Sequence, residues 1–191
     1  MNYLAHLRLS PSDAESMVGN LMGDFRKYLG KEDLPDAVKR GIENHLRVDK
    51  FTDSNEHIFN LKGLFSPQRR RFAGIIIDVA FDYYLTRHWQ TFSPVNLDDF
   101  IDKSHFNIQS MSKIMPERMQ YVMDYMIKEQ WLRSYASLDG ISEVLNRMSA
   151  RIRFDNNLAG AIEEVETNYD ALDQAFLLFF PQLIDHVESN Q

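Results

Sequence analysis

A long apolar pattern runs through residues 69–89, almost wholly apolar from Ile75 to Phe81, and this segment limits what the chain can fold into. It contains no proline, and its single glycine, Gly74, does not interrupt the pattern. The segment is too long for an ordinary strand and is apolar on too many sides for a surface helix. The run Ile75-Ile76-Ile77 alone favours a strand, but no turn residues bracket it. We therefore expect a buried central helix.

Helical patterns continue on both sides of this segment. Capping signals and apolar spacing predict helices over residues 13–29, 37–51, 97–106, 116–135, 141–152 and 158–186. Pro181 should kink or break the last of them, because proline lacks an N–H and crowds the preceding turn. No repeat, linker or low-complexity stretch interrupts the series. The sequence therefore predicts an all-α fold, a single-domain bundle of six to eight helices over residues 1–191.

The composition excludes several classes of function. At 191 residues, 44% of them hydrophobic, the chain can bury a sizeable core. It has no cysteine, which excludes disulfides, thiolate nucleophiles and cysteine-ligated metals. A formal net charge of −7 argues against general affinity for nucleic acid. No stretch is long enough for a membrane span and residues 1–6 lack a signal-peptide pattern, so we expect a cytoplasmic protein with no membrane or nucleic-acid partner.

Two carboxylates, Asp78 and Asp82, lie one turn apart on the predicted central helix. A buried carboxylate without a partner is unstable, so each should be paired, protonated or bound to a metal ion. Pairing with Arg47, Arg71 or Arg87 in a structural ion-pair network is one explanation. Because the two like charges repel each other, a divalent cation explains them better than a single arginine.

Two further polar pairs at helical spacing could complete a metal site. His45 and Asp49 are one turn apart, and so are Asn20 and Asp24 in a helix with apolar neighbours. Each pair alone is a weak signal, because a solvent-facing helix edge has the same spacing. The candidate ligands for a hard nitrogen and oxygen site, suited to Mn²⁺ or Mg²⁺, are Asp24, His45, Asp49, Asp78 and Asp82.

A metal site of this composition favours one kind of chemistry. A bound divalent ion lowers the pKa of a water molecule and binds a phosphoryl oxygen, as in metal-assisted hydrolysis of phosphoesters. Arg47, Lys50 and Arg87 are the nearest cations in the sequence that could bind the phosphate. Ordinary pairing at the surface or at helix ends also explains these three residues.

Several short motifs follow one another in a distinctive order. They are Met1-Asn2-Tyr3-Leu4-Ala5-His6-Leu7, Gly19-Asn20, Gly23-Asp24-Phe25, Gly41-Ile42 with His45, Arg47 and Asp49, Phe51-Thr52-Asp53, Asp78 with Asp82, and Arg87-His88-Trp89. In this order and spacing the chain resembles the bacterial acyl carrier protein phosphodiesterase family. The motifs are dense in the first ninety residues and loose from there to Pro181.

The resemblance implies an enzyme that hydrolyses the phosphodiester between 4′-phosphopantetheine and a serine of holo acyl carrier protein. It implies metal-activated water as the nucleophile, Mn²⁺ as the favoured metal, and a helical fold distantly related to the HD phosphohydrolases. Carried over to this chain, it makes Asp24, His45 and Asp78 metal ligands, with Asp49 and Asp82 as ligands or supporting groups. The expected catalytic residues are Asp24, His45, Asp78 and Asp82.

The resemblance also implies an acidic protein substrate. An enzyme with a charge of −7 needs a local positive surface to bind an acidic partner. Arg69, Arg70 and Arg71 are the best candidates, although they also fit the solvated first turn of the central helix. Two alternatives stay open: an HD-like hydrolase of a nucleotide or other small phosphoester, and a non-catalytic helical binding module in which Asp78 and Asp82 pair with arginines.

Overall fold

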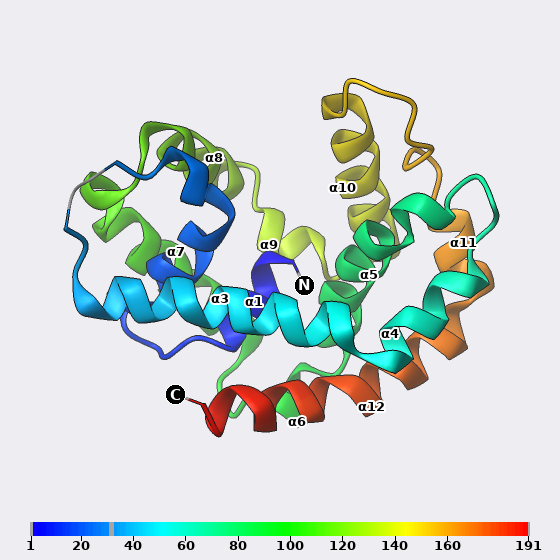
Figure 1. Ribbon diagram of the computed structural model, residues 1–191, viewed down its shortest axis with the longest axis horizontal. Helices are drawn as coiled ribbons and strands as arrows, with labels where there is room; N and C mark the ends of the chain where they lie inside the picture. Colours follow the sequence, from blue (N-terminus) through cyan, green and yellow to red (C-terminus); the bar gives the residue numbers. More distant parts are fainter. Residues whose placement is uncertain (1, 31–32, 191) are drawn as a thin grey trace.

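The computed structural model describes residues 2–30 and 33–190. Within this part of the chain there are twelve α-helices, four short 3₁₀ helices and no strand (Figure 1). The predicted all-α fold is therefore confirmed. The helices outnumber the predicted six to eight, because two predicted helices are divided and several others span only one or two turns. None of the described helices has both the length and the apolar content needed to cross a bilayer.

The elements follow one another along the chain as the figure labels them. The first half contains α1 (Tyr3–Arg8), α2 (Ala14–Met22), η1 (Gly23–Tyr28), α3 (Asp36–Ser54), α4 (Glu56–Leu61), η2 (Lys62–Leu64), η3 (Arg70–Phe72) and α5 (Ala73–Arg87). The second half contains α6 (Trp89–Phe92), α7 (Leu97–Ser110), η4 (Ser112–Ile114), α8 (Glu117–Lys128), α9 (Trp131–Ser134), α10 (Leu138–Arg151), α11 (Ile162–Thr167) and α12 (Tyr169–Glu188).

The central helix predicted from the apolar segment is α5. It contacts α1, α10 and α12, so apolar residues on most of its sides are buried (Figure 1). Phe81 packs edge-on against Phe176 of α12, with 5.4 Å between the ring centroids. The fully buried side chains of α5 include Ile76, Ile77, Val79, Ala80 and Phe81. Burial on several sides explains why this helix lacks the polar stripe of a surface helix.

Two glycines allow α2 and α3 to approach each other closely. A Cβ atom on Gly19 would lie 2.2 Å from the carbonyl oxygen of Val38, and one on Gly41 would lie 2.6 Å from that of Ser16. No larger residue fits at either position without separating the two helices. This close contact places the end of α2 and the start of η1 beside the middle of α3.

The last helix does not break at Pro181, where the sequence predicts a kink or a break. The predicted helix over residues 158–186 is divided earlier, between α11 and α12, and α12 continues through Pro181. The proline removes one helical hydrogen bond, whose acceptor would be the carbonyl of Leu177. Pro181 and Leu177 are both exposed, so water can hydrate the carbonyl that the proline leaves without a donor.

Candidate functional site

Helix α3 carries His45 and Asp49 on one face, as their spacing predicts. The Nε2 atom of His45 lies 3.1 Å from Oδ2 of Asp49 and 3.5 Å from Oδ1 of Asp24 in η1. The His45 ring is buried, and Gly23 makes room for it, because a Cβ atom there would lie 2.2 Å from ring carbon Cδ2. The structure therefore brings together three of the predicted metal ligands.

A second histidine, His6 of α1, joins this group. Its ring stacks on that of His45, with 4.1 Å between the centroids and 18° between the planes. The Nε2 atom of His6 lies 3.3 Å from Oδ1 of Asp49, and its Nδ1 atom lies 2.9 Å from Oδ1 of Asn20. Spacing in the sequence gives no sign of this role, because every partner of His6 lies on another element.

The donor set of this cluster fits a divalent metal ion. One ligand atom each from His6, His45 and Asp49 lies within 4.8 Å of the others. Because the carbonyl oxygen of Asn20 accepts a hydrogen bond from Nδ1 of His6, the lone pair of the ring is on Nε2. This buried Nε2 has no hydrogen-bond partner among the described residues, although it faces a carboxylate oxygen. A lone pair and a carboxylate oxygen repel each other unless a cation lies between them.

Burial controls the charges of the cluster. It lowers the pKa of His6 to about 4, which keeps the ring neutral and able to ligate a metal at pH 7. Burial alone would raise the pKa of Asp49, but the neighbouring rings of His45 and His6 outweigh it, and this pKa lies well below its usual range. Asp49 is therefore ionised at neutral pH and offers a negative ligand.

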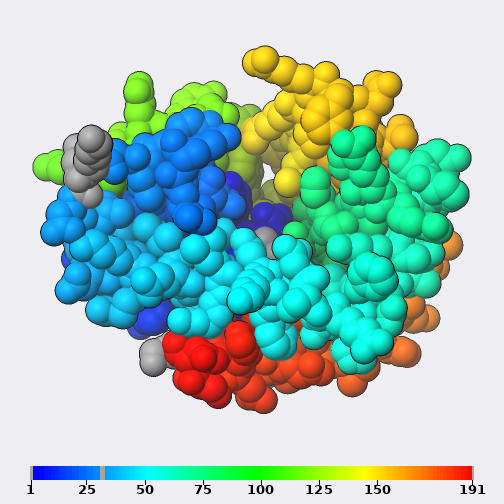
Figure 2. All heavy atoms as spheres, in the orientation of Figure 1, coloured from blue at the N-terminus to red at the C-terminus, as the bar shows by residue number. Residues whose placement is uncertain are grey.

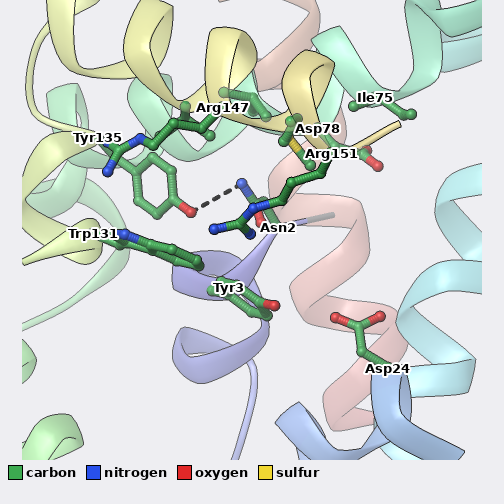
Figure 3. Close-up of a pocket in the computed structure, with 12 residues that line it drawn as sticks. Asn2, Tyr3, Asp24, Ile75, Asp78, Trp131, Tyr135, Arg147 and Arg151 are labelled. Carbon is green, nitrogen blue, oxygen red and sulfur yellow. Dashed lines mark hydrogen bonds between the residues drawn. The ribbon is translucent and has the colours of Figure 1, made fainter. Parts of the chain in front are cut away.

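Asp24 connects the cluster to a cleft that contains the second predicted carboxylate, Asp78. The cleft has a volume of about 230 Å³. Figure 2 shows its opening between α10 (yellow) and the region of η1 (blue), and Figure 3 shows both carboxylates along one side. Burial raises the pKa of each of these carboxyl groups. The other lining residues are Asn2, Tyr3, Ile75, Val79, Trp131, Tyr135, Val144, Arg147, Met148 and Arg151.

Asp82 does not line the cleft and instead holds α1 in place. Its side chain is fully buried, and its two oxygens accept hydrogen bonds from the backbone N–H groups of Leu4 (2.8 Å) and Ala5 (3.1 Å). These N–H groups belong to the first turn of α1 and have no acceptor within that helix. The buried carboxyl group of Asp82 thus has backbone partners, and this contact fixes the helix that carries His6.

The position of Asp82 predicts a pH dependence of folding. Burial raises the pKa of Asp82 to about 7, although its two backbone hydrogen bonds lower it. In the unfolded chain this pKa is about 4, so between these values the folded state binds a proton that the unfolded state lacks. The contribution of Asp82 to stability is therefore largest below about pH 4 and is lost as the pH rises through about 7.

The measurement is urea unfolding across this pH range for the wild type and for Asp82→Asn. The amide does not titrate, so the difference between the two free energies of unfolding isolates the carboxyl group from all other titrating residues. We expect the free energy of unfolding of the wild type to fall, relative to that of Asp82→Asn, as the pH rises. Two parallel pH curves would show that Asp82 titrates at its ordinary value in the folded protein.

The predicted phosphate-binding cations do not line the cleft. Arg47 lines a separate pocket together with Arg40. Lys50 is exposed on α3, and Arg87 is the last residue of α5. None of these three residues is among those that line the cleft with Asp24 and Asp78.

The predicted docking arginines differ from one another in their surroundings. Arg69 forms an ion pair with Glu164 (3.0 Å between Nη1 and Oε1) and donates to the carbonyl oxygen of Asn157. It therefore anchors the segment before α11. Arg70 and Arg71 are exposed, and the Arg71 guanidinium lies over the rings of neighbouring aromatic residues.

The cations that do line the cleft, Arg147 and Arg151, were missed in the sequence. They are one turn apart near the end of α10. Their spacing is that of an ordinary charged helix surface, and they are more than sixty residues from Asp78. Only the packing of α10 against α5 brings them opposite the acidic side of the cleft.

Comparison with known proteins indicates the same family as the order of the motifs. A family model described as acyl carrier protein phosphodiesterase matches residues 1–183. Proteins named acyl carrier protein phosphodiesterase are 36% identical in Serratia proteamaculans (strain 568) and 35% in Klebsiella pneumoniae (strain 342), each over 192 residues and 100% of both chains. The one in Escherichia coli O9:H4 is 34% identical over 185 residues and 96% of both chains. No solved structure matches, so a relation to HD phosphohydrolases stays a prediction. The chain belongs to the acyl carrier protein phosphodiesterase family.

Proposed function

We propose that this protein is a metal-dependent phosphodiesterase that releases 4′-phosphopantetheine from holo acyl carrier protein and leaves the apo form. Family membership and the names of the relatives support the reaction and the substrate. The observation that supports metal dependence is the cluster of His6, His45 and Asp49, whose ligand atoms lie within 4.8 Å of one another.

The residues of the cluster would have different roles in this proposal. His6, His45 and Asp49 would hold the ion, and Asp24, which touches both His45 and the cleft, would join them on the substrate side. Bound Mn²⁺, or Mg²⁺ in its place, would supply a water molecule of lowered pKa and neutralise charge on the phosphoryl oxygens.

The remaining carboxylates have supporting parts in this proposal. Asp78 lines the cleft with Asp24 and is our candidate to complete the ligand set or to bind the attacking water. Asp82 contributes through position, because it fixes the first turn of α1 and thereby the ring of His6.

Adding Mn²⁺ to the chelator-treated protein should raise its stability. A metal concentration of one hundred times the dissociation constant stabilises a folded state by about 2.7 kcal/mol, provided that the unfolded chain does not bind. Thermal unfolding with and without Mn²⁺, and with Mg²⁺ and Ca²⁺ for comparison, measures this effect. If no divalent ion changes the melting temperature of the wild type, the result would favour the alternative of a non-catalytic binding module.

The substrate is tested by mass spectrometry of holo acyl carrier protein after incubation with the enzyme and Mn²⁺. We expect the mass of the phosphopantetheine group to be lost from the carrier protein, and chelator to prevent the loss. A carrier protein left intact by an enzyme that hydrolyses nucleotides would refute the proposed substrate and support the small-phosphoester alternative.

A further inference from the structure

The side of the cleft that faces Asp24 and Asp78 is basic and aromatic. Figure 3 shows Arg151 extending from α10 across the cleft toward Tyr3, and Arg147 extends from the same helix. The cleft is therefore polarised, with carboxylates on one side and guanidinium groups on the other. Such an arrangement suits a ligand that is itself anionic at one point and is bound between the two sides.

Arg151 is available for an anion. Its guanidinium carbon lies 5.3 Å from the centroid of the Trp131 ring, and it forms no ion pair with a described carboxylate. Arg147, in contrast, contacts Glu143 of its own helix at 3.4 Å. An arginine held over a ring keeps its planar set of N–H donors free for a phosphate.

The rest of this side is a pre-formed apolar wall. The rings of Tyr3 and Trp131 are stacked, with 6.2 Å between centroids and 17° between planes. The Tyr135 hydroxyl accepts a hydrogen bond from Nδ2 of Asn2 (3.0 Å), as the dashed line in Figure 3 marks. Walls of this kind bind elongated uncharged chains through buried area, and a few polar groups fix the orientation.

We propose that this basic and aromatic side binds the phosphopantetheine arm of the substrate. Arg151 donates hydrogen bonds to the non-bridging phosphate oxygens, and the wall formed by Tyr3, Trp131 and Tyr135 receives the uncharged amide chain. Asp24 and Asp78 alone would repel a phosphate, and Arg151 offsets that repulsion. The assignment rests on the proposed function, but it adds that the enzyme recognises the arm itself and not only the carrier protein.

Binding of free 4′-phosphopantetheine tests this assignment without catalysis. Isothermal titration calorimetry measures its dissociation constant with the wild type and with Arg151→Met, which keeps an apolar stem but removes the charge. We expect binding to weaken about 10- to 100-fold, the usual loss for a charge-assisted contact to phosphate. The matched control is Arg153→Met, an exposed arginine two residues away that does not line the cleft, and it should bind like the wild type.

A second variant distinguishes the contribution of the cleft wall to binding from that of the phosphate contact. Val144 lines the cleft, so Val144→Trp should fill part of it and weaken binding of 4′-phosphopantetheine while leaving binding of inorganic phosphate unchanged. The Mn²⁺-induced rise in melting temperature should be the same in all three variants, which checks that they fold and keep the metal cluster.

Two results would overturn the inference: Arg151→Met binding as tightly as the wild type, or wild-type protein binding 4′-phosphopantetheine no better than inorganic phosphate. Failure of the proposed function is detected in a different experiment, the mass spectrometry described above, in which the wild-type enzyme would leave holo acyl carrier protein intact. A wild type that cleaves holo acyl carrier protein, together with unchanged binding in Arg151→Met, would reject this inference alone.

Discussion

Replacing His45 with alanine should lower kcat/KM for holo acyl carrier protein by about 10³-fold or more, since losing metal-assisted charge stabilisation removes several kcal/mol from the transition state. His45 is the residue that touches every other member of the cluster: it stacks on His6 and lies within 3.5 Å of Asp24 and Asp49. The measurement is the rate of conversion to the apo form by mass spectrometry. The Mn²⁺-induced rise in melting temperature should disappear in the same variant.

Because the His45 ring is buried, its removal also leaves a cavity that costs stability. His45→Gln therefore accompanies the alanine variant, since glutamine fills more of the space without an imidazole nitrogen. The matched control is His57→Ala, an exposed histidine of α4, which should leave activity unchanged. A folded His45 variant that keeps more than a tenth of the wild-type kcat/KM would contradict the metal centre assigned to α3.

The second large effect is expected at the contact between α2 and α3. Gly19→Ala should lower the free energy of unfolding by about 2 kcal/mol, because overpacking costs about 3 kcal/mol and the better helix propensity of alanine returns about 1 kcal/mol. The obstructing atom is a backbone oxygen of Val38, 2.2 Å from the added Cβ, so no side-chain rotation relieves the clash. Urea unfolding measures the change, and Mn²⁺ affinity should fall with it as α3 moves away from η1.

Gly63→Ala is the matched control for this substitution. A Cβ atom at Gly63 would meet no atom within 4 Å, so alanine there should be neutral or stabilise by up to about 1 kcal/mol. Equal effects of the two substitutions would show that α2 and α3 tolerate separation and that the close contact does not position the cluster.

Periodicity in the sequence predicts most of the helices, but it does not predict where the backbone conformation of a single residue ends a helix. Residues 73–87 form the predicted central helix, because an apolar run of that length has no other stable arrangement in an all-α fold. The predicted helix over residues 116–135 is divided at Gln130, which adopts a left-handed backbone conformation (φ 52°). No feature of the sequence marks this residue, since glutamine rarely adopts that conformation.

Spacing along the chain predicts contacts only between residues that share a helix, whereas the grouping of Asp24 with His45 is expected from the family resemblance. The contact between His45 and Asp49 follows from their spacing of one turn. The contacts of His6 and Arg151 depend on how α1 and α10 pack against other helices, and spacing along the chain carries no information about such packing. For Asp82, the sequence shows that the charge needs a partner, but backbone N–H groups leave no mark in the order of side chains.

The attachment of α1 has a practical consequence for work with the purified protein. Asn2 and Tyr3 line the cleft, and His6 belongs to the proposed metal cluster, so the start of α1 is part of the candidate site. An affinity tag joined to the chain before Asn2 would lie near the proposed substrate site, and a histidine tag there would add ligands that compete for the proposed metal ion. The end of α12 lies on another part of the molecule (Figure 1), so a cleavable tag placed after it leaves both the cleft and the metal cluster unaltered.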